Sequence, residues 1–369
     1  MPTLLTDRTR IVSFRNCPRL RYLNFHAYGH GIVPTGLSMP LSMGSALHLV
    51  LAQLRSGADP ASVIATQSTD YRAILTAALD DGHVIEEQVR LLEGMSWAWV
   101  RVRLPLIQQE YEPILIEREI LWNMGVWKDS DGTLLEIVDM VRCDVIERRR
   151  ADGLLFYREV KSTSTGDAEW AKQFDTSTQM LANLLAIKET LHEEVAGVII
   201  EGVIKGSRTK DRAKSSPFFG QKVQYSPLCY LYTGPSGTSL EWARNLTKTP
   251  SWQIMDARTL VYEMLDEAAC TALFTTVPPI CPRPEHLERY RKQVLAQEGR
   301  IWSDLCRSTD LDVAFPMNDD HCHRYFGSPC AYKDVCFDPQ IGSSPIQSGR
   351  FIPRVPHHEH ERLLLASKT

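Results

Sequence analysis

The spacing of hydrophobic residues changes from a helical period to a strand period and back along the chain. Residues 43–54 (MGSALHLVLAQL) place leucine and valine on one helical face, and residues 60–110 predict further helices. Residues 113–123 (PILIEREILWN) alternate between apolar and polar positions, which predicts a strand with Glu117 and Glu119 on one face. The chain is therefore expected to begin with helices and to enter a sheet only after them.

A β-hairpin is predicted over residues 136–163 (EIVDMVRCDVIERRRADGLLFYREVKST). Its first strand ends near Arg148, an Asp-Gly pair at 152–153 is typical of a tight turn, and the second strand covers residues 154–161. The remaining elements are expected to be arranged around this hairpin. They are a helix over residues 166–190, strands over residues 195–204 and 222–233, and helices over residues 237–272 and 284–306.

Three charged residues occupy strand positions of this hairpin: Asp144 on the first strand, and Glu159 and Lys161 on the second. Glu159 and Lys161 are two residues apart, so their side chains point to the same face, and the hairpin can place Asp144 beside them. Two carboxylates that converge on one point favour a hard cation with oxygen ligands, such as Mg²⁺ or Mn²⁺. A lysine beside that cation can orient a water molecule or stabilise charge on a phosphate.

The same pattern has other interpretations. A half-exposed hairpin with a cross-strand ion pair would also place acidic and basic residues on neighbouring strands. Asp139 competes with Asp144 as a metal ligand, but the two lie an odd number of positions apart and face opposite ways on a regular strand. Only one of them can therefore join Glu159.

Composition narrows the class of protein. The chain has 369 residues, of which 43% are hydrophobic, and this is sufficient for a large core in one elaborated domain or two. A formal net charge of −4 argues against a globally basic nucleic-acid-binding protein but leaves room for a local basic groove. The sequence has neither an apolar run of membrane-spanning length nor a secretory signal, so we expect a cytoplasmic protein with no membrane association.

One segment concentrates positive charge. Residues 205–216 (KGSRTKDRAKSS) carry five cations against one acid, Asp211, and their Gly and Ser content predicts a loop. Such a segment is either a solvated surface loop or, beside a phosphate-cleaving site, a contact to a nucleic-acid backbone. The five cations are Lys205, Arg208, Lys210, Arg212 and Lys214.

Three of the nine cysteines lie close together near the C-terminal end: Cys322, Cys330 and Cys336. In a reducing compartment such a cluster suggests that thiolates bind a metal. Cys17, which Pro18 follows directly, is the one other cysteine in a comparable setting. His321 and His323 are competing ligands, and they would favour zinc over an iron–sulfur cluster.

Taken in order, these motifs resemble the PD-(D/E)XK nuclease superfamily, in its RecB-like branch with an iron–sulfur cluster. That branch includes CRISPR-associated exonucleases, AddB-type nuclease domains and similar phage proteins. The resemblance covers most of residues 13–336 as scattered motifs: an opening cysteine before proline, a Gly-x-x-x-His helix, a strand aspartate, a (D/E)-x-K tripeptide, a helix glutamine and closing cysteines. Here these are Cys17, Gly44 to His48, Asp144, Glu159 to Lys161, Gln179, and Cys322, Cys330 and Cys336.

Three positions depart from the family pattern. Val141 stands where the family usually has a glycine before its aspartate. Asn183 replaces the tyrosine after the glutamine, which weakens the substrate-positioning role of that helix. Seven residues separate Cys322 from Cys330, whereas many members have two. No metal ligand is lost, and the sequence Arg-Cys-Asp-Val around Asp144 fits the family's strand, which favours this aspartate as the ligand.

The resemblance implies an α/β fold with a restriction-endonuclease-like core: a mixed central sheet flanked by helices, with the N- and C-terminal segments joined by a metal cluster. It implies one elaborated nuclease domain over residues 1–340, with cluster-binding segments at about 13–25 and 320–338 and a catalytic core at about 40–235. Residues 341–369 are expected to be a flexible tail, and we expect its HHEH stretch to be solvated rather than to bind metal.

The implied activity is metal-dependent hydrolysis of DNA phosphodiester bonds, by a single-strand exonuclease acting in recombination, repair or DNA processing. Lys161 would position the attacking water, and Gln179 would be a further catalytic residue. A [4Fe–4S] cluster would be bound by the four cysteines, and the partners would be DNA and a helicase or recombination protein. The Mg²⁺ or Mn²⁺ ligands would be His48, Asp144, Glu159 and the carbonyl of Val160.

Two other classes of protein stay open. One is a non-catalytic DNA-binding or recombination-accessory protein that keeps the fold and the cluster, although the presence of all four catalytic residue types argues against it. The other is a zinc-stabilised enzyme that acts on a different phosphoester. The five cations within residues 205–214 favour a polymeric substrate, since a small ligand would not need them all.

Overall fold

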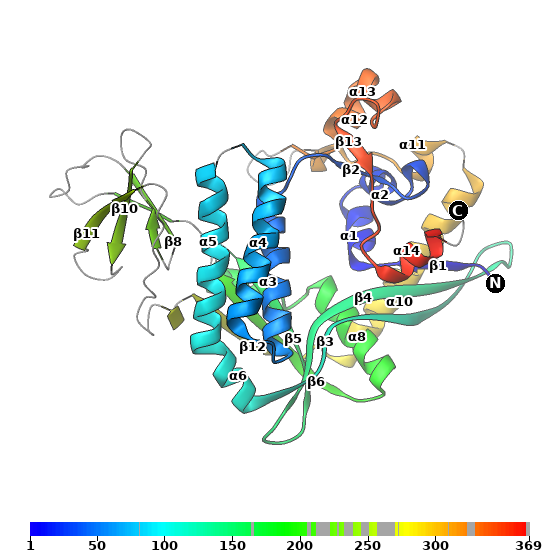
Figure 1. Cartoon of the computed structure of the whole chain (residues 1–369). Coiled ribbons are helices and arrows are strands. Elements are labelled where there is room, and N and C mark those ends of the chain that lie inside the picture. Colours follow the sequence, from blue (N-terminus) through cyan, green and yellow to red (C-terminus); the bar gives the residue numbers. More distant parts are fainter. Residues whose placement is uncertain are drawn as a thin grey trace.

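The computed structural model describes residues 1–80, 82–163, 166–204, 273–308, 310–322 and 329–366, together with residues 270–271 and the backbone of five short strands between residues 208 and 256. Within this part of the chain, no helix is both long enough and apolar enough to cross a bilayer. Figure 1 shows a central sheet with helices packed on it.

A mixed sheet of six strands forms the centre, in the order β1-β4-β5-β6-β12, with β3 also paired to β4. The β1–β4 and β5–β6 pairs are parallel, and the β3–β4, β4–β5 and β6–β12 pairs are antiparallel. The length of β4 allows it to contact three partners. The strands are β1 Thr3–Thr6, β3 Tyr111–Lys128, β4 Leu134–Arg149, β5 Leu155–Thr163, β6 Val195–Ile204 and β12 Phe274–Ile280.

Helices cover both faces of this sheet. On one face, α3, α4 and α5 pack against Phe156 and Val160 of β5. On the other, α8 and α10 pack against Leu155 and Tyr157 of the same strand. Alternate residues of β5 thus pack into two different hydrophobic cores, one on each face of the sheet. The helices are α3 Met39–Arg55, α4 Pro60–Ala78, α5 Gly82–Ala98, the π-helical turn η2 Trp99–Arg103, α6 Leu104–Glu110, α7 Ala168–Lys172, α8 Thr178–Leu191 and α10 Pro284–Arg307.

These elements confirm the mixed α/β architecture and the central hairpin expected from the sequence. The hairpin turns between Arg149 and Leu155, and Gly153 has a φ of 74°, which glycine adopts without strain. The proline-rich stretch before α10 contributes Pro278 and Pro279 to β12. This is possible because β12 is the last strand of the sheet and needs backbone donors on one side only.

Two of the helices predicted from the sequence are not found as predicted in the structure. The helix expected over residues 166–190 is divided into α7 and α8, because Ser177 takes an extended conformation and begins a new helix as its N-cap. The helix expected over residues 237–272 contains two paired strands instead, β10 Ser239–Arg244 and β11 Ser251–Asp256. Their tryptophan and isoleucine residues favour strands. The other short strands of this region are β7 Arg208–Asp211, β8 Lys222–Ser226 and β9 Cys229–Leu231.

The segment after residue 341 differs from the flexible tail expected. Its strand β13 (Phe351–Pro353) pairs with β2 (Ile32–Pro34), and α14 (Glu359–Ala366) follows. Phe351 stacks on Tyr332 with the ring centroids 5.5 Å apart. The segment therefore belongs to the folded part of the protein. The remaining elements are α1 Arg8–Asn16, α2 Pro18–Phe25, η1 Ala27–Gly29, α11 Leu311–Ala314, η3 Asp319–His321, α12 Lys333–Phe337 and α13 Pro339–Ser343.

A buried ionic cluster holds this C-terminal segment against the N-terminal helices. Arg354 lies 2.5 Å from Glu361, and Glu361 also binds Arg10 of α1. Arg10 lies 2.6 Å from Asp7, and the guanidinium groups of Arg10 and Arg354 both stack on the ring of Phe25. Burial makes an unpaired charge costly here, so the two ends of the chain are held together by mutual charge pairing.

Candidate active site

The hairpin strands separate at the place where the charged residues lie. β4 pairs with β5 only from Val145 to Arg148, and beyond this point β5 continues beside β6 alone. Asp144 is next to Val145 and lies just outside the paired stretch. Its Oδ2 accepts a hydrogen bond from the N–H of Val160 at 2.8 Å. This bond holds the carboxylate between the separating strands.

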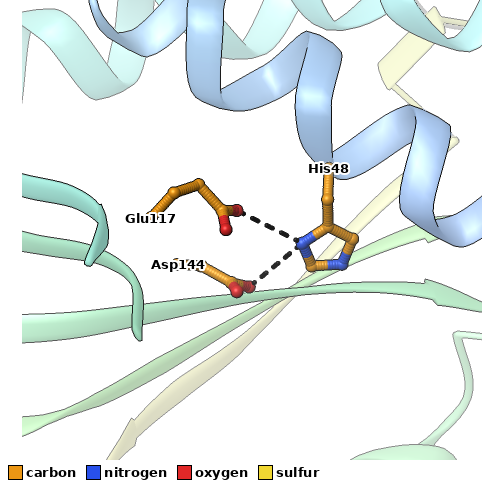
Figure 2. Close-up of side chains that lie close together, drawn as sticks. All are labelled: His48, Glu117 and Asp144. Atoms are coloured by element: carbon orange, nitrogen blue, oxygen red, sulfur yellow. Dashed lines mark ion pairs between the residues drawn. The ribbon is translucent and has the colours of Figure 1, made fainter. Parts of the chain in front are cut away.

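His48 reaches the same point from α3. Its Nδ1 lies 3.5 Å from Asp144 Oδ2 and 3.8 Å from Glu117 Oε1 (Figure 2). Gly44, one helical turn earlier, makes this possible, because a Cβ there would lie only 3.2 Å from Ser162 Oγ. The Gly-x-x-x-His spacing thus lets α3 approach the sheet closely enough for the imidazole of His48 to lie beside Asp144 and Glu117.

Glu117 is the site residue that sequence reasoning missed. It lies on β3 opposite Asp144, since Ile116 pairs with Val145 and Arg118 pairs with Cys143. Its φ of 49° is in the left-handed region, which is rare for a residue with a side chain. The only available signal was the pair of glutamates on an alternating strand. That signal does not show which glutamate turns toward the helix.

Three side chains form a compact group of possible ligands. One ligand atom each from His48, Glu117 and Asp144 lies within 4.8 Å of the others. The side chain of Arg142 donates to Glu117 from its Nε at 2.8 Å, so this carboxylate is held from the side. Glu159 is outside the compact group, although the sequence had placed it in the ligand set.

Glu159 instead joins Lys161 and Gln179 on the face of the sheet that α8 covers. Lys161 Nζ pairs with Glu159 Oε1 and lies 3.0 Å from Gln179 Oε1. The amide of Gln179 donates to Glu159 Oε1 at 2.5 Å, and Arg8 donates to Gln179 Oε1 at 2.8 Å. Gln179 lies in the first turn of α8, so the start of this helix positions the amide over the strand.

The electrostatics of these groups show an excess of negative charge. Burial raises the pKa of Glu159 to about 7, and the nearby charge of Asp144 contributes to this shift. Burial works against a charge on His48, but Asp144, Glu117 and Glu159 outweigh it and raise its pKa to about 10. Burial would raise the pKa of Asp144, but His48 and Lys161 lower it. The cluster of carboxylates thus favours a positive charge at its centre.

The donor set suits a divalent cation. Glu159 Oε2 is buried and has no hydrogen-bond partner among the described residues. Together with Glu117, Asp144 and His48 it offers oxygen atoms and one imidazole, which are ligands that Mg²⁺ and Mn²⁺ accept. For Val160, whose carbonyl is a predicted ligand, the structure shows a hydrogen bond from its N–H to Asp144 Oδ2. The residues present therefore fit a metal ion of this class.

Both groups open into one cleft of about 560 Å³. Its lining includes the charged and polar residues above on one side and part of α3 on the other. Asp139, the competitor of Asp144, lies elsewhere: it is fully buried beside Thr6 of β1 and Trp122 of β3. The remaining lining residues are Pro40, Leu41, Gly44, Ser45, Leu49, Arg142, Ser162 and His357.

The four predicted cysteines lie around a second pocket, which they line together with Leu20, Leu23 and Tyr332. Cys17 is the residue between α1 and α2, and Cys336 lies on α12. None of the four takes part in a disulfide within the described residues. Burial raises the pKa of Cys336 to about 11, and the other three thiols contribute to that shift. His321 also lines this pocket, whereas His323 lies outside the described residues.

The basic segment is described only in part. Arg208 and Lys210 lie on β7, for which the structure describes the backbone alone. Lys205, Arg212 and Lys214 lie outside the described residues.

Comparison with known proteins identifies the family. A search of the curated proteins finds no match to the chain. The family model of the PD-(D/E)XK nuclease superfamily matches residues 8–337, and this range contains the hairpin, the four cysteines and every residue that lines the cleft except His357. A mixed sheet flanked by helices, with a group of possible metal ligands at the cleft, agrees with that match. The chain therefore belongs to the PD-(D/E)XK nuclease superfamily.

Proposed function

We propose that the protein is a Mg²⁺- or Mn²⁺-dependent deoxyribonuclease of the RecB-like branch, which digests single-stranded DNA from an end and carries a [4Fe–4S] cluster. The observation that carries the catalytic part is that one cleft gathers His48, Asp144, Glu159, Lys161 and Gln179 from α3, β4, β5 and α8. The exonuclease mode, a role in recombination, repair or DNA processing, a helicase or recombination partner and a cytoplasmic location rest on the order of the motifs and on composition.

The proposed reaction gives each side chain of the cleft a task. Asp144, Glu159, His48 and Glu117 would hold the metal, which supplies a water of lowered pKa and offsets charge on the scissile phosphate. Lys161 lies within hydrogen-bonding distance of Gln179 and beside Glu159, so its ammonium group can hold the attacking water or the phosphate oxygens. Gln179 fixes the position of Lys161 through that contact.

Digestion of single-stranded DNA labelled at either end tests the catalytic part. With Mg²⁺ present, we expect the wild type to degrade the strand and Lys161→Ala to lose about 100-fold or more of the rate. Lys172→Ala is the matched control, because Lys172 is an exposed lysine on α7 that pairs only with Glu169 in the described contacts. A circular single strand that resists digestion would support the exonuclease mode. Equal activity of wild type and Lys161→Ala would contradict the assignment.

The arrangement of the four cysteines supports a shared metal group. All four line one pocket, and none of them takes part in a disulfide within the described residues. A metal group that joined Cys17 to Cys336 would close a very long loop of chain. The order of the cysteine motifs favours an iron–sulfur cluster over zinc.

Protein purified without oxygen tests the cluster. We expect the broad visible absorption of an iron–sulfur protein and iron in the purified protein, both lost in Cys330→Ala. Cys281→Ala is the control, since Cys281 is exposed and is not part of the pocket. A colourless wild type that contains zinc would overturn this part of the proposal.

A role for the basic segment in holding the DNA backbone is also proposed, for Lys205, Arg208, Lys210, Arg212 and Lys214. Neutralising them together should weaken DNA binding evenly across sequences and reduce the dependence of affinity on salt. An unchanged salt dependence of binding would contradict this role.

A further inference from the structure

A groove between α3 and α4 continues the catalytic cleft. It has a volume of about 470 Å³, which is within the range of ligand-binding pockets. It shares Leu41, Ser45 and Leu49 with the catalytic cleft, so the two hollows adjoin each other along α3. None of the catalytic groups lines this groove, and the proposed reaction assigns no task to it.

The wall that this groove shares with the cleft is apolar and unusually exposed. Leu41 is 73% exposed, and Ile74 on the opposing helix α4 is 51% exposed. Leu49 is 45% exposed and lies next to His48 in sequence. Large apolar side chains left in water along a ligand cleft indicate a surface that something apolar covers.

The opposite wall of the cleft is polar and partly cationic. Arg142, Lys161, Gln179 and His357 line it together with the carboxylates of the proposed metal site, and His357 comes from the C-terminal segment before α14. With a metal ion offsetting these carboxylates, the two hollows together would have one side suited to phosphates and one side suited to flat apolar groups. A single-stranded nucleic acid has this amphipathic character, because its bases are not hidden inside a duplex.

The floor of the groove offers a polar contact. Asp70 and Gln67 line it, whereas the described lining includes no lysine or arginine. A negative charge here disfavours a phosphate, and the amide and the carboxylate are groups that pair with the edges of bases. Tyr71 also lines the groove, but it is only 1% exposed and its hydroxyl is paired with Ser42.

We propose that the groove between α3 and α4 binds unstacked nucleobases of the single strand adjacent to the scissile phosphate. The proposal rests on the proposed nuclease function for its substrate class, and it adds the place where the bases lie. Apolar contact with Leu41, Leu49 and Ile74 would hold the base faces, while Gln67 and Asp70 would contact a base edge. The strand would thereby enter the cleft with its phosphates toward Arg142 and Lys161.

The test compares a dye-labelled thymidine oligonucleotide with the same strand carrying abasic residues. Affinity is measured by fluorescence anisotropy in EDTA, so that no cleavage occurs, and digestion is measured separately with Mg²⁺. We expect the wild type to bind the abasic strand at least about fivefold more weakly. The double variant Leu41→Ser, Ile74→Ser should bind both strands with similar, weak affinity.

The double variant should fold as the wild type does, because both of its substitutions are at exposed positions. Leu41 and Ile74 are exposed, and Val313→Ser is the control at an exposed apolar position, 70% accessible, which does not line the groove. Gln67→Ala should weaken binding of the base-bearing strand but not of the abasic strand. The control should keep the preference of the wild type.

Equal binding of the two strands by the wild type would overturn the proposal, and would leave the groove to another occupant such as a protein partner. A preference that survives in the double variant would also overturn it, because the bases would then be bound elsewhere. The digestion assay tests the nuclease proposal separately. If the wild type prefers the base-bearing strand but does not cleave it, the nuclease proposal is refuted and the proposal of a base-binding groove is retained.

Discussion

Gly44 and His48 lie one turn apart on the face of α3 that meets the sheet. The missing side chain at position 44 allows α3 to lie close to Ser162 on β5. This approach sets the 3.5 Å separation of His48 and Asp144. A residue that takes no part in the chemistry thus controls the position of one that does.

We expect Gly44→Val to reduce the rate of DNA digestion by about 10- to 100-fold, because α3 must move away and carry His48 with it. The measurement is the digestion rate alongside the melting temperature, which should fall only slightly. Gly82→Ala is the matched control, since an added Cβ there meets nothing within 4 Å. Wild-type digestion by Gly44→Val would show that this close contact does not position His48.

Asp139 is a second residue whose surroundings decide its behaviour. It is fully buried, and its contacts with Trp122 and the backbone of Met140 are too weak to offset that burial. Burial raises its pKa from 3.8 to about 8, and the nearby charge of Asp7 adds to the shift. The folded protein therefore keeps a proton on Asp139 at pH values where the unfolded chain has lost it.

The sign of the effect on stability follows. The stabilising contribution of Asp139 is complete below about pH 4 and is lost as the pH rises to about 8. We expect the melting temperature of Asp139→Asn, compared with that of the wild type, to rise steadily across this interval, because the amide cannot ionise. Other titrating groups are common to both proteins and cancel in the difference. A difference that does not change with pH would contradict the raised pKa.

At the scale of elements, α8 is joined to the sheet by a polar contact in the middle of its buried face. Asn183 donates to the hydroxyl of Tyr157 at 2.7 Å, and both side chains are buried. Asn183 also lies 3.4 Å from the carbonyl of Arg142 on β4. The departure from the family's tyrosine thus gives this helix a contact to the sheet, away from the lining of the cleft.

We expect Asn183→Leu to lower the free energy of unfolding by about 1–3 kcal/mol, since the hydroxyl of Tyr157 would be buried without a partner. The double variant Asn183→Leu, Tyr157→Phe should recover part of that loss. Urea unfolding of the four proteins in this cycle is the measurement. If the two losses simply add, the side chains do not act as a pair.

Some of these elements could be predicted from the sequence because their signals are local. The hairpin is one case, since Asp152 and Gly153 mark its turn and its strands are adjacent. The pairing of β13 with β2 could not be predicted, because Phe351 lies more than 300 residues from its partner Pro34. Glu117 could not be assigned to the cleft because its place depends on the register of β3 against β4 and on a positive φ.

At the scale of the whole molecule, the two ends of the chain lie against each other. α1 and α2 contact the C-terminal segment through the cluster of Arg10, Glu361 and Arg354. The same segment brings His357 to the cleft, and His358 lies 3.4 Å from Glu119 on β3. Stability and access to the cleft are therefore connected through the last part of the chain.

We expect a chain that ends after Arg350 to melt at a lower temperature and to digest DNA more slowly. The truncation removes a paired strand, leaves Arg10 without its partner Glu361, and takes His357 away from the cleft. Melting temperature and digestion rate are the measurements. Val355→Ala, at an exposed position of the same segment, is the control and should behave as the wild type. A truncated protein of unchanged stability would contradict this role of the segment.

Because the two ends of the chain contact each other, the fold can be completed only after the C-terminal end has been synthesised. Cys17 leaves the ribosome early, but Cys336, Phe351 and Glu361 follow only after more than 300 further residues. At typical translation rates this interval is roughly tens of seconds. During that time α1 and α2 lack the contacts that they make with the C-terminal segment. A premature stop codon near the end of the message would leave these contacts unmade, although the ion pair of Arg21 on α2 with Glu298 on α10 would remain, and we expect the cell to degrade such a chain more readily.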